Sequence, residues 1–299
     1  MSTTSTSSGV VLVDKPGAMT SHDVVDRLRR LLGERRIGHA GTLDPMATGL
    51  LVVAVGPATR LLRFAQAGLK RYEGTATVGV ATDSLDADGR EVGRAAVPVL
   101  DQTDLDAAAA AFHGAQWQVP PMVSAIKVGG RRLHELARDG VEVVREPRPI
   151  EVVAFELRRT DRADEWAFDV TCSSGTYVRV LLSDVAQRLG TLAHLSSLRR
   201  VASGAHRVDD ALTLEDVAAR VASGTPVVAP PRQLVADLPW VTLSEDDEVA
   251  MRRGQRLTVA DAPPATRRLV ALDRRGGLIG LLVERDGRWQ PDVVLAEAG

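Results

Sequence analysis

The chain has 299 residues, of which 44% are hydrophobic and 25% are charged, as in an ordinary globular protein that builds its own core. Its one cysteine, Cys172, excludes an intrachain disulfide and the Cys-x-x-Cys class of metal site, and it fits a reducing cytoplasm. The net charge of −2 lacks the overall basic signature of a nucleic-acid-binding protein.

The first part of the chain predicts alternating strands and helices. Residues 1–8 are polar and lack the basic and apolar regions of a signal peptide, so we expect a disordered tail. Ser21 is expected to cap a helix that ends at Gly33, because the apolar residues between them follow the helical period. Further elements follow in this order: strands at Gly9–Asp14 and Leu50–Val55, a short helix from Pro57, a strand at Arg71–Val80, a turn at Asp83–Gly89 and a helix from its cap Thr103 to Phe112. The longest apolar run, near Leu50–Val55, is too short to span a bilayer.

Residues 119–150 differ in composition from the rest. They are rich in Pro, Gly and Arg, and they predict an excursion from the main sheet with a short helix near Leu133–Ala137. The next predicted elements are a strand at Trp166–Cys172, a helix from about Thr176 to Leu189, a strand at Leu195–Val201 and a helix from the capping-box residue Thr213 to about Val221. The mixed order, without regular βαβ alternation, predicts an α+β fold.

The last part of the chain predicts a small module of its own. Residues 223–239 are rich in proline and predict a linker. The module that follows is mostly β structure, with strands at Trp240–Leu243 and Leu269–Asp273, a helix at Ser244–Arg253 and a hairpin turn at Asp286-Gly287.

The segment from Arg36 to Leu51 is the most constrained in the chain. A single carboxylate, Asp44, lies between a glycine-flanked histidine, His39, and a proline, Pro45. Glycines recur where the backbone must bend sharply or approach another group closely, and a proline pushes the preceding residue towards an extended conformation. The pattern therefore predicts a rigid loop that presents one acid, which is typical of a functional site.

The residues of this loop leave four roles open for Asp44. An aspartate before proline often caps a loop by accepting backbone N–H groups. A glycosidase nucleophile needs a second carboxylate across the sugar, and a phosphoryl acceptor needs an acidic Mg²⁺ cluster, which the neighbouring sequence lacks. The fourth role is a carboxylate nucleophile that acts on a ribonucleoside and is kept ionised by an arginine.

Several separated segments together resemble the motifs of the TruB family of tRNA pseudouridine synthases, in the family's order and approximate spacing. They are Asp14-Lys-Pro-Gly17 with Thr20-Ser21, Gly38–Gly49, Lys70-Arg-Tyr72, Ser124-Ala-Ile-Lys127, Ser174-Gly-Thr-Tyr-Val-Arg179 and Leu198-Arg-Arg200. The resemblance implies an α+β pseudouridine synthase catalytic fold at 9–234, with a mixed, largely antiparallel sheet flanked by helices. It also implies an RNA-clamping insertion at 119–150 and a β-rich, PUA-like RNA-binding domain at 238–299.

The resemblance also implies roles for individual residues. Asp44 matches the nucleophile, Arg179 the arginine that pairs with it, and Tyr72 the tyrosine that stacks on uracil. Substrate contacts are implied at five more positions: His39 fills the space left by the flipped base, Tyr177 and Leu198 line the uracil pocket, Lys15 supports the site, and Lys127 meets a backbone phosphate.

The implied reaction is isomerisation of uridine to pseudouridine at position 55 in the T loop of tRNA, without a metal or cofactor. Whether Asp44 attacks C1′, adds to C6 or acts through a glycal is left open. The expected partner is the tRNA T-arm stem-loop, with no membrane, no obligatory protein partner, a cytoplasmic location and a monomeric state. Two other readings remain: a tRNA-binding folding factor (RNA chaperone) with secondary catalysis, and a guide-RNA-dependent relative, which the compact length and lack of a basic tail disfavour.

Overall fold

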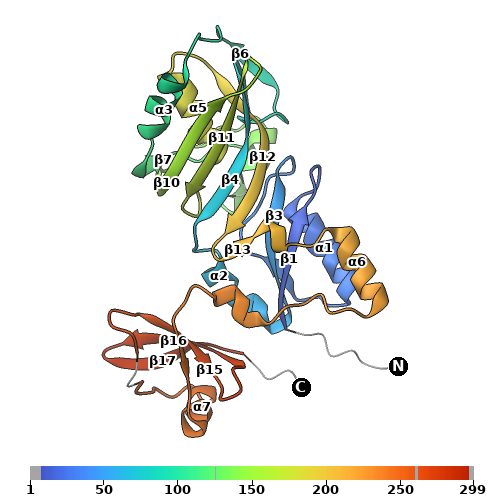
Figure 1. Cartoon of the computed structure of the whole chain (residues 1–299), viewed down its shortest axis with the longest axis vertical. Coiled ribbons are helices and arrows are strands. Elements are labelled where there is room, and N and C mark those ends of the chain that lie inside the picture. Colours follow the sequence, from blue (N-terminus) through green and yellow to red (C-terminus); the bar gives the residue numbers. More distant parts are fainter. Residues whose placement is uncertain (1–7, 125, 260–261, 296–299) are drawn as a thin grey trace. The chain divides into compact units, whose positions relative to one another are not determined.

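The computed structural model describes residues 8–124, 126–259 and 262–295, and Figure 1 shows it as a mixed α/β chain. Residues 1–7 of the predicted tail lie outside the described residues. The described residues form two compact units. Unit 1 comprises those of Met1–Asp44, Leu50–Gly68 and Gly204–Gly299, and unit 2 comprises those of Pro45–Gly49 and Leu69–Ser203.

The helices are distributed over both units. They are α1 (Ser21–Leu32), α2 (Leu62–Ala65), α3 (Gln102–Ala110), α4 (Leu133–Arg138), α5 (Val178–Arg188), α6 (Leu214–Ser223) and α7 (Glu245–Arg252), with 3₁₀ turns η1 (Gly56–Leu61), η2 (Val208–Asp210) and η3 (Pro231–Val235). The strands are β1 (Gly9–Lys15), β2 (Ile37–His39), β3 (Thr48–Val55), β4 (Lys70–Val78), β5 (Val80–Thr82), β6 (Glu91–Arg94), β7 (Gly114–Gln118), β8 (Lys127–Val128), β9 (Arg131–Arg132), β10 (Arg148–Arg159), β11 (Glu165–Cys172), β12 (Ala193–Ser203), β13 (His206–Arg207), β14 (Trp240–Thr242), β15 (Arg268–Leu272), β16 (Leu278–Arg285) and β17 (Arg288–Val294).

Unit 2 is built on a sheet in the order β12-β4-β11-β10-β7, in which all neighbours are antiparallel. The first residues of β3, Thr48 and Gly49, pair with β12 in parallel, so the predicted mixed and largely antiparallel sheet is confirmed. Burial alternates strictly along β11, because successive side chains of a strand point to opposite faces. Helix α3 contacts β10 and helix α5 contacts β12, and both cover the sheet in Figure 1.

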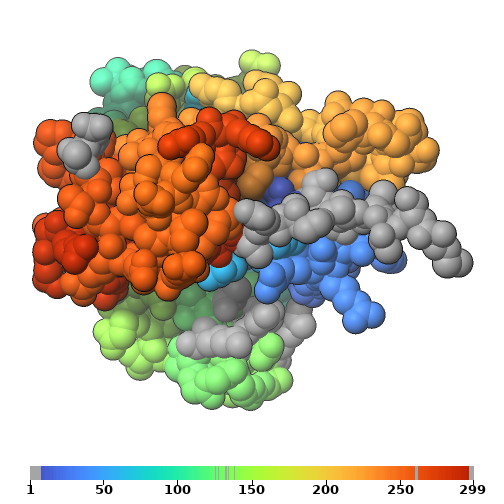
Figure 2. Space-filling model, turned by 90° about the horizontal axis from the view of Figure 1, so that it is seen from below, coloured from blue at the N-terminus to red at the C-terminus, as the bar shows by residue number. Residues whose placement is uncertain are grey.

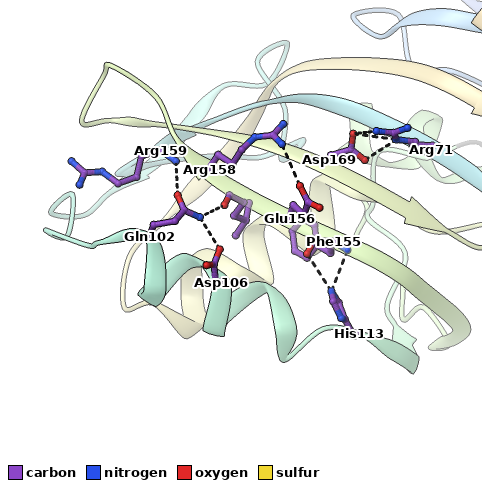
Figure 3. A network of polar contacts seen from close by, with 10 residues as sticks. Arg71, Gln102, Asp106, His113, Phe155, Glu156, Arg158, Arg159 and Asp169 are labelled. Atoms are coloured by element: carbon purple, nitrogen blue, oxygen red, sulfur yellow. Dashed lines mark hydrogen bonds and ion pairs between the residues drawn. The ribbon is translucent and has the colours of Figure 1, made fainter.

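Side chains at both ends of α3 bind the backbone of β10 (Figure 3). Gln102, at the start of the helix, donates from Nε2 to Leu157 O at 2.6 Å. His113, just after the helix, accepts the N–H of Phe155 at Nε2 over 3.1 Å. On the other face of the sheet, Arg71 of β4 forms a two-pronged ion pair with Asp169 of β11, with a shortest N···O distance of 2.7 Å.

In unit 1, β1 lies beside β3, and β2 pairs antiparallel with β3. The core beside these strands is formed by apolar residues of β1, α1, β2, β3 and α6. The predicted linker at 223–239 is not a free connection. Val10 of β1 and Ala229 exchange two main-chain hydrogen bonds of 2.9 and 2.8 Å, and Leu234 and Val235 of η3 are buried. The proline-rich composition therefore marks a segment packed along β1 rather than a flexible spacer.

The carboxy-terminal module is β-rich, as predicted. Strands β14 to β17 form one sheet in chain order. Together with α7 they enclose a separate apolar core that includes Met251 and Trp289. The hairpin between β16 and β17 turns at Asp286 and Gly287, whose φ angles are 53° and 73°. Figure 2 shows the surface of this module in orange to red. Its likeness to a PUA domain stays a prediction.

The module contacts helix α2 within unit 1. Arg63 of α2 lies 2.5 Å from Asp292 of β17, and Arg60 Nη1 donates to Val294 O. The guanidinium groups of Arg63 and Arg268 lie over the ring of Phe64, 4.6 and 5.2 Å from its centroid. Arg268 also lies 3.5 Å from Asp292, so one carboxylate offsets the charge of both arginines.

Two helix caps and several strands, among them β2, β6, β7 and β10, differ from the sequence-based predictions. The cap of α1 is Thr20 rather than Ser21, and the cap of α3 is Asp101 rather than Thr103; each forms a capping box with an aspartate three residues later. The predicted cap Thr213 of α6 is confirmed. Strand β10 was not predicted, because a bulge between Val152 and Ala154 interrupts its alternation of buried and exposed residues.

Candidate active site

The loop that leads to Asp44 is fixed by Ser21 at the start of α1. Ser21 is buried, and its Oγ accepts the N–H of Leu43 at 2.8 Å and donates to Leu43 O at 3.2 Å. One hydroxyl therefore holds both main-chain groups of the residue directly before Asp44. Asp44 itself is half-buried, so it is partly screened from water while it remains accessible.

His39 enters this loop from the end of β2, where it pairs with Val53 of β3 and is half-buried. The backbone turns sharply after it: Ala40 N donates to Val52 O at 2.8 Å, and Gly41 has a φ of 99°. A side chain at Gly41 would be strained in that conformation, so the glycine is required by the turn. The predicted rigid loop is thus present, and His39 lies where it begins.

Two motifs that are 150 residues apart in the chain meet inside unit 2. Gly49 has a φ of 97°, and a Cβ at this position would lie only 2.4 Å from Arg200 O. Thr48 Oγ1 lies 3.5 Å from Leu198 O. The backbone after the Asp44 loop therefore rests directly on β12, at the segment Leu198–Arg200, and only glycine permits this approach.

Tyr72 and Leu198 lie on adjacent strands of the same sheet. Arg200 of β12 pairs with Tyr72 of β4, and Leu198 pairs with Gly74. Partners across an antiparallel pair share a face, as do residues two apart, so these side chains belong to one face. Tyr72 is half-buried, whereas Leu198 is 8% exposed. The structure thus brings these two predicted site residues together.

A hollow of about 530 Å³ lies beside Leu198 in unit 2. Its lining includes Met46 and Thr48, which follow Asp44 in the chain, and Leu198 of β12, together with the charged residues Glu73, Asp88 and Arg199. Leu198 supplies an apolar side chain to the wall of this hollow, and its role as a base contact stays a prediction. Tyr72 is not among its lining residues.

Lys70 and Cys172 are buried partners across β4 and β11. Burial, followed by the positive charge of Arg200, lowers the pKa of Lys70 from 10.5 to about 8. Burial raises the pKa of the Cys172 thiol to about 11. The face that carries Tyr72 therefore contains two buried basic side chains, Lys70 and Arg200.

Arg179 and Tyr177 lie together at the start of α5. Arg179 is 3% exposed; it donates from Nη1 to Ser84 O at 2.8 Å and from Nη2 to Val123 O at 2.7 Å. Its Nη1 lies 3.5 Å from Asp86 Oδ2, and its Cζ lies 5.8 Å from the ring centroid of Tyr177. The arginine predicted to pair with Asp44 is thus held rigidly from two loops. The pair itself stays a prediction.

The two lysines predicted to support the site differ in what the structure shows. Lys15 is fully buried at the end of β1, and its Nζ donates to Pro16 O at 2.9 Å and to Met19 O at 2.6 Å. It therefore ties down the loop that leads into α1. Lys127 lies in β8, but its side chain is outside the described part of the structure. Both roles stay predictions.

Three residues at this site were not singled out from the sequence. Ser84 and Asp86 fell within a predicted turn, and Gln118 directly precedes the Val119-Pro-Pro121 run. Asp86 is buried and accepts from Ser84 Oγ at 2.5 Å, and Leu85 between them has a φ of 65°. A non-glycine residue with positive φ marks a backbone held by its surroundings, but the sequence gives no signal for it.

Among the residues that the structure describes, no cluster of His, Cys, Asp or Glu has the geometry to hold a metal ion. Within the same residues, no helix is long and apolar enough to cross a membrane.

Comparison with known proteins decides the family. Residues 29–178 match the family model of the TruB family pseudouridylate synthase (N terminal domain), and residues 179–235 match that of the tRNA pseudouridylate synthase B C-terminal domain. The chain belongs to the TruB family. The two TruB family models together span residues 29–235, and this span includes each of the motifs from Gly38 to Arg200 noted above.

Curated TruB relatives align with most of the chain. The tRNA pseudouridine synthase B of Heliobacterium modesticaldum is 41% identical over 92% of this chain and 90% of its own length. The enzyme of the same name from Streptococcus thermophilus is 37% identical over 97% of this chain and 99% of its own length. The one from Opitutus terrae is 52% identical over 71% of this chain and 87% of its own length.

Solved structures with the same fold are more distant in sequence. A Cbf5-Nop10-Gar1 complex contains a chain that is 24% identical, with a TM-score of 0.72 over 92% of this TruB chain and 78% of that one. An H/ACA RNP bound to a substrate RNA containing 2'-deoxyuridine contains a chain that is 21% identical, with a TM-score of 0.74 over 97% and 86%. These likenesses establish the pseudouridine synthase fold.

Proposed function

We propose that this TruB family protein isomerises uridine to pseudouridine at position 55 in the T loop of tRNA. The observation that carries the proposal is the identity of 41% over 92% of the chain with a tRNA pseudouridine synthase B. Membership of the TruB family makes the chain an isomerase. The specific substrate position and the roles of the residues are our proposal.

The reaction breaks the bond between C1′ of the ribose and N1 of uracil, and it forms a bond between C1′ and C5. The proton on C5 is lost and N1 gains one, so the atoms balance without an oxidant or a group donor. The protein must therefore detach the base, rotate it and return a proton, which acid–base and nucleophilic side chains can supply.

Asp44 is the nucleophile of the proposed reaction. A carboxylate serves this purpose only when it is ionised and correctly oriented. The two hydrogen bonds between Ser21 and the main chain of Leu43 fix the backbone directly before Asp44 and so support its orientation. Arg179 pairs with Asp44 and keeps it ionised, because a guanidinium favours the charged form of a carboxylate. Attack at C1′, addition at C6 and elimination to a glycal all use Asp44 in this form.

The base is read by Tyr72 and Leu198 after it leaves the stack. Tyr72 stacks on the uracil, and Leu198 forms an apolar wall, in keeping with its place in the hollow of unit 2. Tyr177 contributes a second aromatic surface, and His39 occupies the space that the flipped uridine leaves. Lys15 supports the Asp44 loop.

The RNA arm is held by the insertion at 119–150 in this proposal. Arginines are frequent there, and Arg145 is anchored by a 3.1 Å bond from its Nη1 to Pro120 O. Lys127 meets a backbone phosphate. The carboxy-terminal module adds little electrostatic attraction, because its arginines are balanced by acids such as Glu245 and Asp292. The enzyme works as a monomer on free tRNA without a partner protein.

The test is mass mapping of pseudouridine after chemical derivatisation of an unmodified tRNA transcript incubated with the purified protein. We expect modification at the T-loop uridine with the wild type and a loss of about 10³-fold or more with Asp44→Asn. Asp161→Asn, a carboxylate on an exposed loop, is the matched control and should retain wild-type activity. No modification of that uridine by the wild type would refute the proposed function.

The same experiment separates the alternatives. The Asp44→Asn variant should still bind tRNA. If it also promotes tRNA folding as fully as the wild type, the result would favour the hypothesis of an RNA chaperone. Activity of the purified protein on a bare T-arm stem-loop would exclude a requirement for guide RNA.

A further inference from the structure

Gln118 is a buried amide whose two polar atoms both bind the main chain of Tyr177. It is 5% exposed at the end of β7. Its Nε2 donates to Tyr177 O at 3.1 Å, and its Oε1 accepts the N–H of Tyr177 at 2.8 Å. One side chain thus fixes the peptide groups on both sides of Tyr177, which lies 59 residues further along the chain.

This contact fixes a helix start that has no side-chain cap. Tyr177 is the N-cap residue of α5, and its own side chain makes no capping hydrogen bond. Helix starts are usually fixed by a Ser, Thr, Asp or Asn at this position. The carbonyl of Tyr177 also accepts from Val180 N and Leu181 N, both at 3.1 Å. Gln118 therefore sets the direction in which the first turn of α5 leaves the sheet.

The chain segment that follows Gln118 also binds the guanidinium of Arg179. Val123 O accepts from Arg179 Nη2 at 2.7 Å, five residues after Gln118. Gln118 fixes the backbone two residues before Arg179, and Val123 fixes its guanidinium. The stretch 118–123 therefore holds both the backbone before Arg179 and one nitrogen of its guanidinium, while the other nitrogen donates to Ser84 O.

That stretch is the base of the insertion. Gln118 pairs with Arg148 in the β7·β10 ladder, so the two ends of residues 119–150 are joined at this point. A change in the position of the insertion relative to β7 and β10 would move Gln118. The start of α5, which carries Tyr177 and Arg179, would then move with it.

We propose that Gln118 is a positioning residue for Tyr177 and Arg179, and that it couples the base of the insertion to the catalytic turn of α5. This inference rests on the proposed function. Gln118 acts through the main chain of Tyr177 and makes no contribution of its own to the chemistry.

The test replaces Gln118 by methionine, which keeps the volume of the side chain and removes both hydrogen bonds. With a T-arm stem-loop as substrate, we expect kcat to fall by about 10- to 100-fold, because small misplacements of a catalytic group have effects of this size. KM should stay within about twofold. Gln116→Met is the matched control, since Gln116 is on the same strand and donates to Phe112 O at 2.5 Å, away from Tyr177.

Hydrogen exchange provides a readout that general destabilisation would not reproduce. In Gln118→Met, the amides of residues 177–181 should exchange faster, while those of α1 keep wild-type rates. If the methionine variant does not fold, Gln118→Asn keeps the amide but is too short to reach both groups, and the same fall in kcat is expected.

Three outcomes decide the matter. Wild-type kcat in either folded variant overturns the inference, as does faster exchange spread evenly over α1 and α5. A rise in KM with unchanged kcat, which lowers only kcat/KM, also overturns it. An inactive wild type would instead refute the proposed function, because the inference concerns only the difference between variant and wild type.

Discussion

Helices α1 and α5 both begin next to residues of the proposed site, but they are fixed in opposite ways. The start of α1 is closed by Thr20 and Asp23, three residues apart, through a reciprocal capping box. The start of α5 has no such local cap and depends on Gln118, 59 residues earlier in the chain. A local cap stabilises a helix wherever it lies, whereas a contact from a distant segment ties the start of the helix to a particular neighbour. Where the direction of a side chain decides its function, the second arrangement gives more control.

Among the changes that test this comparison, the largest effect is expected from Arg179→Lys, which keeps the positive charge but loses the two-nitrogen fork of the guanidinium. A lysine cannot donate to Ser84 O and Val123 O in the geometry of a guanidinium. We expect kcat to fall by about 100-fold or more, measured as single-turnover pseudouridine formation. Arg162→Lys is the control, because Arg162 forms a similar fork with Asp164 on an exposed loop. Wild-type kcat in Arg179→Lys would show that charge alone suffices.

A smaller effect is expected from Ser21→Ala, on the α1 side of the comparison. The change leaves the buried N–H and carbonyl of Leu43 without their partner, which lowers the free energy of unfolding by about 1–3 kcal/mol. Because Asp44 follows directly, kcat should also fall by about tenfold. Denaturant unfolding and initial rates measure the two effects. Ser223→Ala removes a hydroxyl that donates to Arg220 O at an exposed helix end and should change neither.

The smallest effect is expected from Thr20→Ala, which removes only the local cap. The midpoint of thermal unfolding should fall by about 2 °C, and kcat should not change. Hydrogen bonds from Thr20 lower the pKa of Asp23 below 3.8. A carboxyl with a depressed pKa in the folded state stabilises the protein above its unfolded pKa, and this contribution is lost as the pH falls through its folded pKa. The difference between wild type and Thr20→Ala should therefore shrink below pH 3.8. A loss of kcat would mean that α1 also positions the site through its cap.

What the sequence predicts follows the same division between local and distant contacts. Gly33, the capping box at Thr213 and the Asp286-Gly287 turn were predicted because each is fixed by residues within four positions. The cap of α1 was misplaced by one residue, since Ser21 has the right chemistry but turns inward to Leu43.

The parts of the candidate site that were missed depend on contacts between distant segments. Gln118 and Asp86 have ordinary sequence surroundings, and only the fold brings them to Tyr177 and Arg179. Asp44, Tyr72 and Arg179 were predicted through a family resemblance, because the chemistry of a lone aspartate before proline left four roles open. Gly49 was visible as a constraint, but its reason, the approach to Arg200 O, required the folded sheet.

The burial of Cys172 gives the chain a built-in reporter. A thiolate is the species that reacts with alkylating reagents, and burial both hides this sulfur and raises its pKa to about 11. It is the only cysteine in the sequence, and it lies on β11 across from Lys70. Labelling of an otherwise unmodified chain would therefore require a local opening that exposes this buried face of the sheet, so the labelling rate measures how often the face that carries Lys70 and Tyr72 becomes accessible.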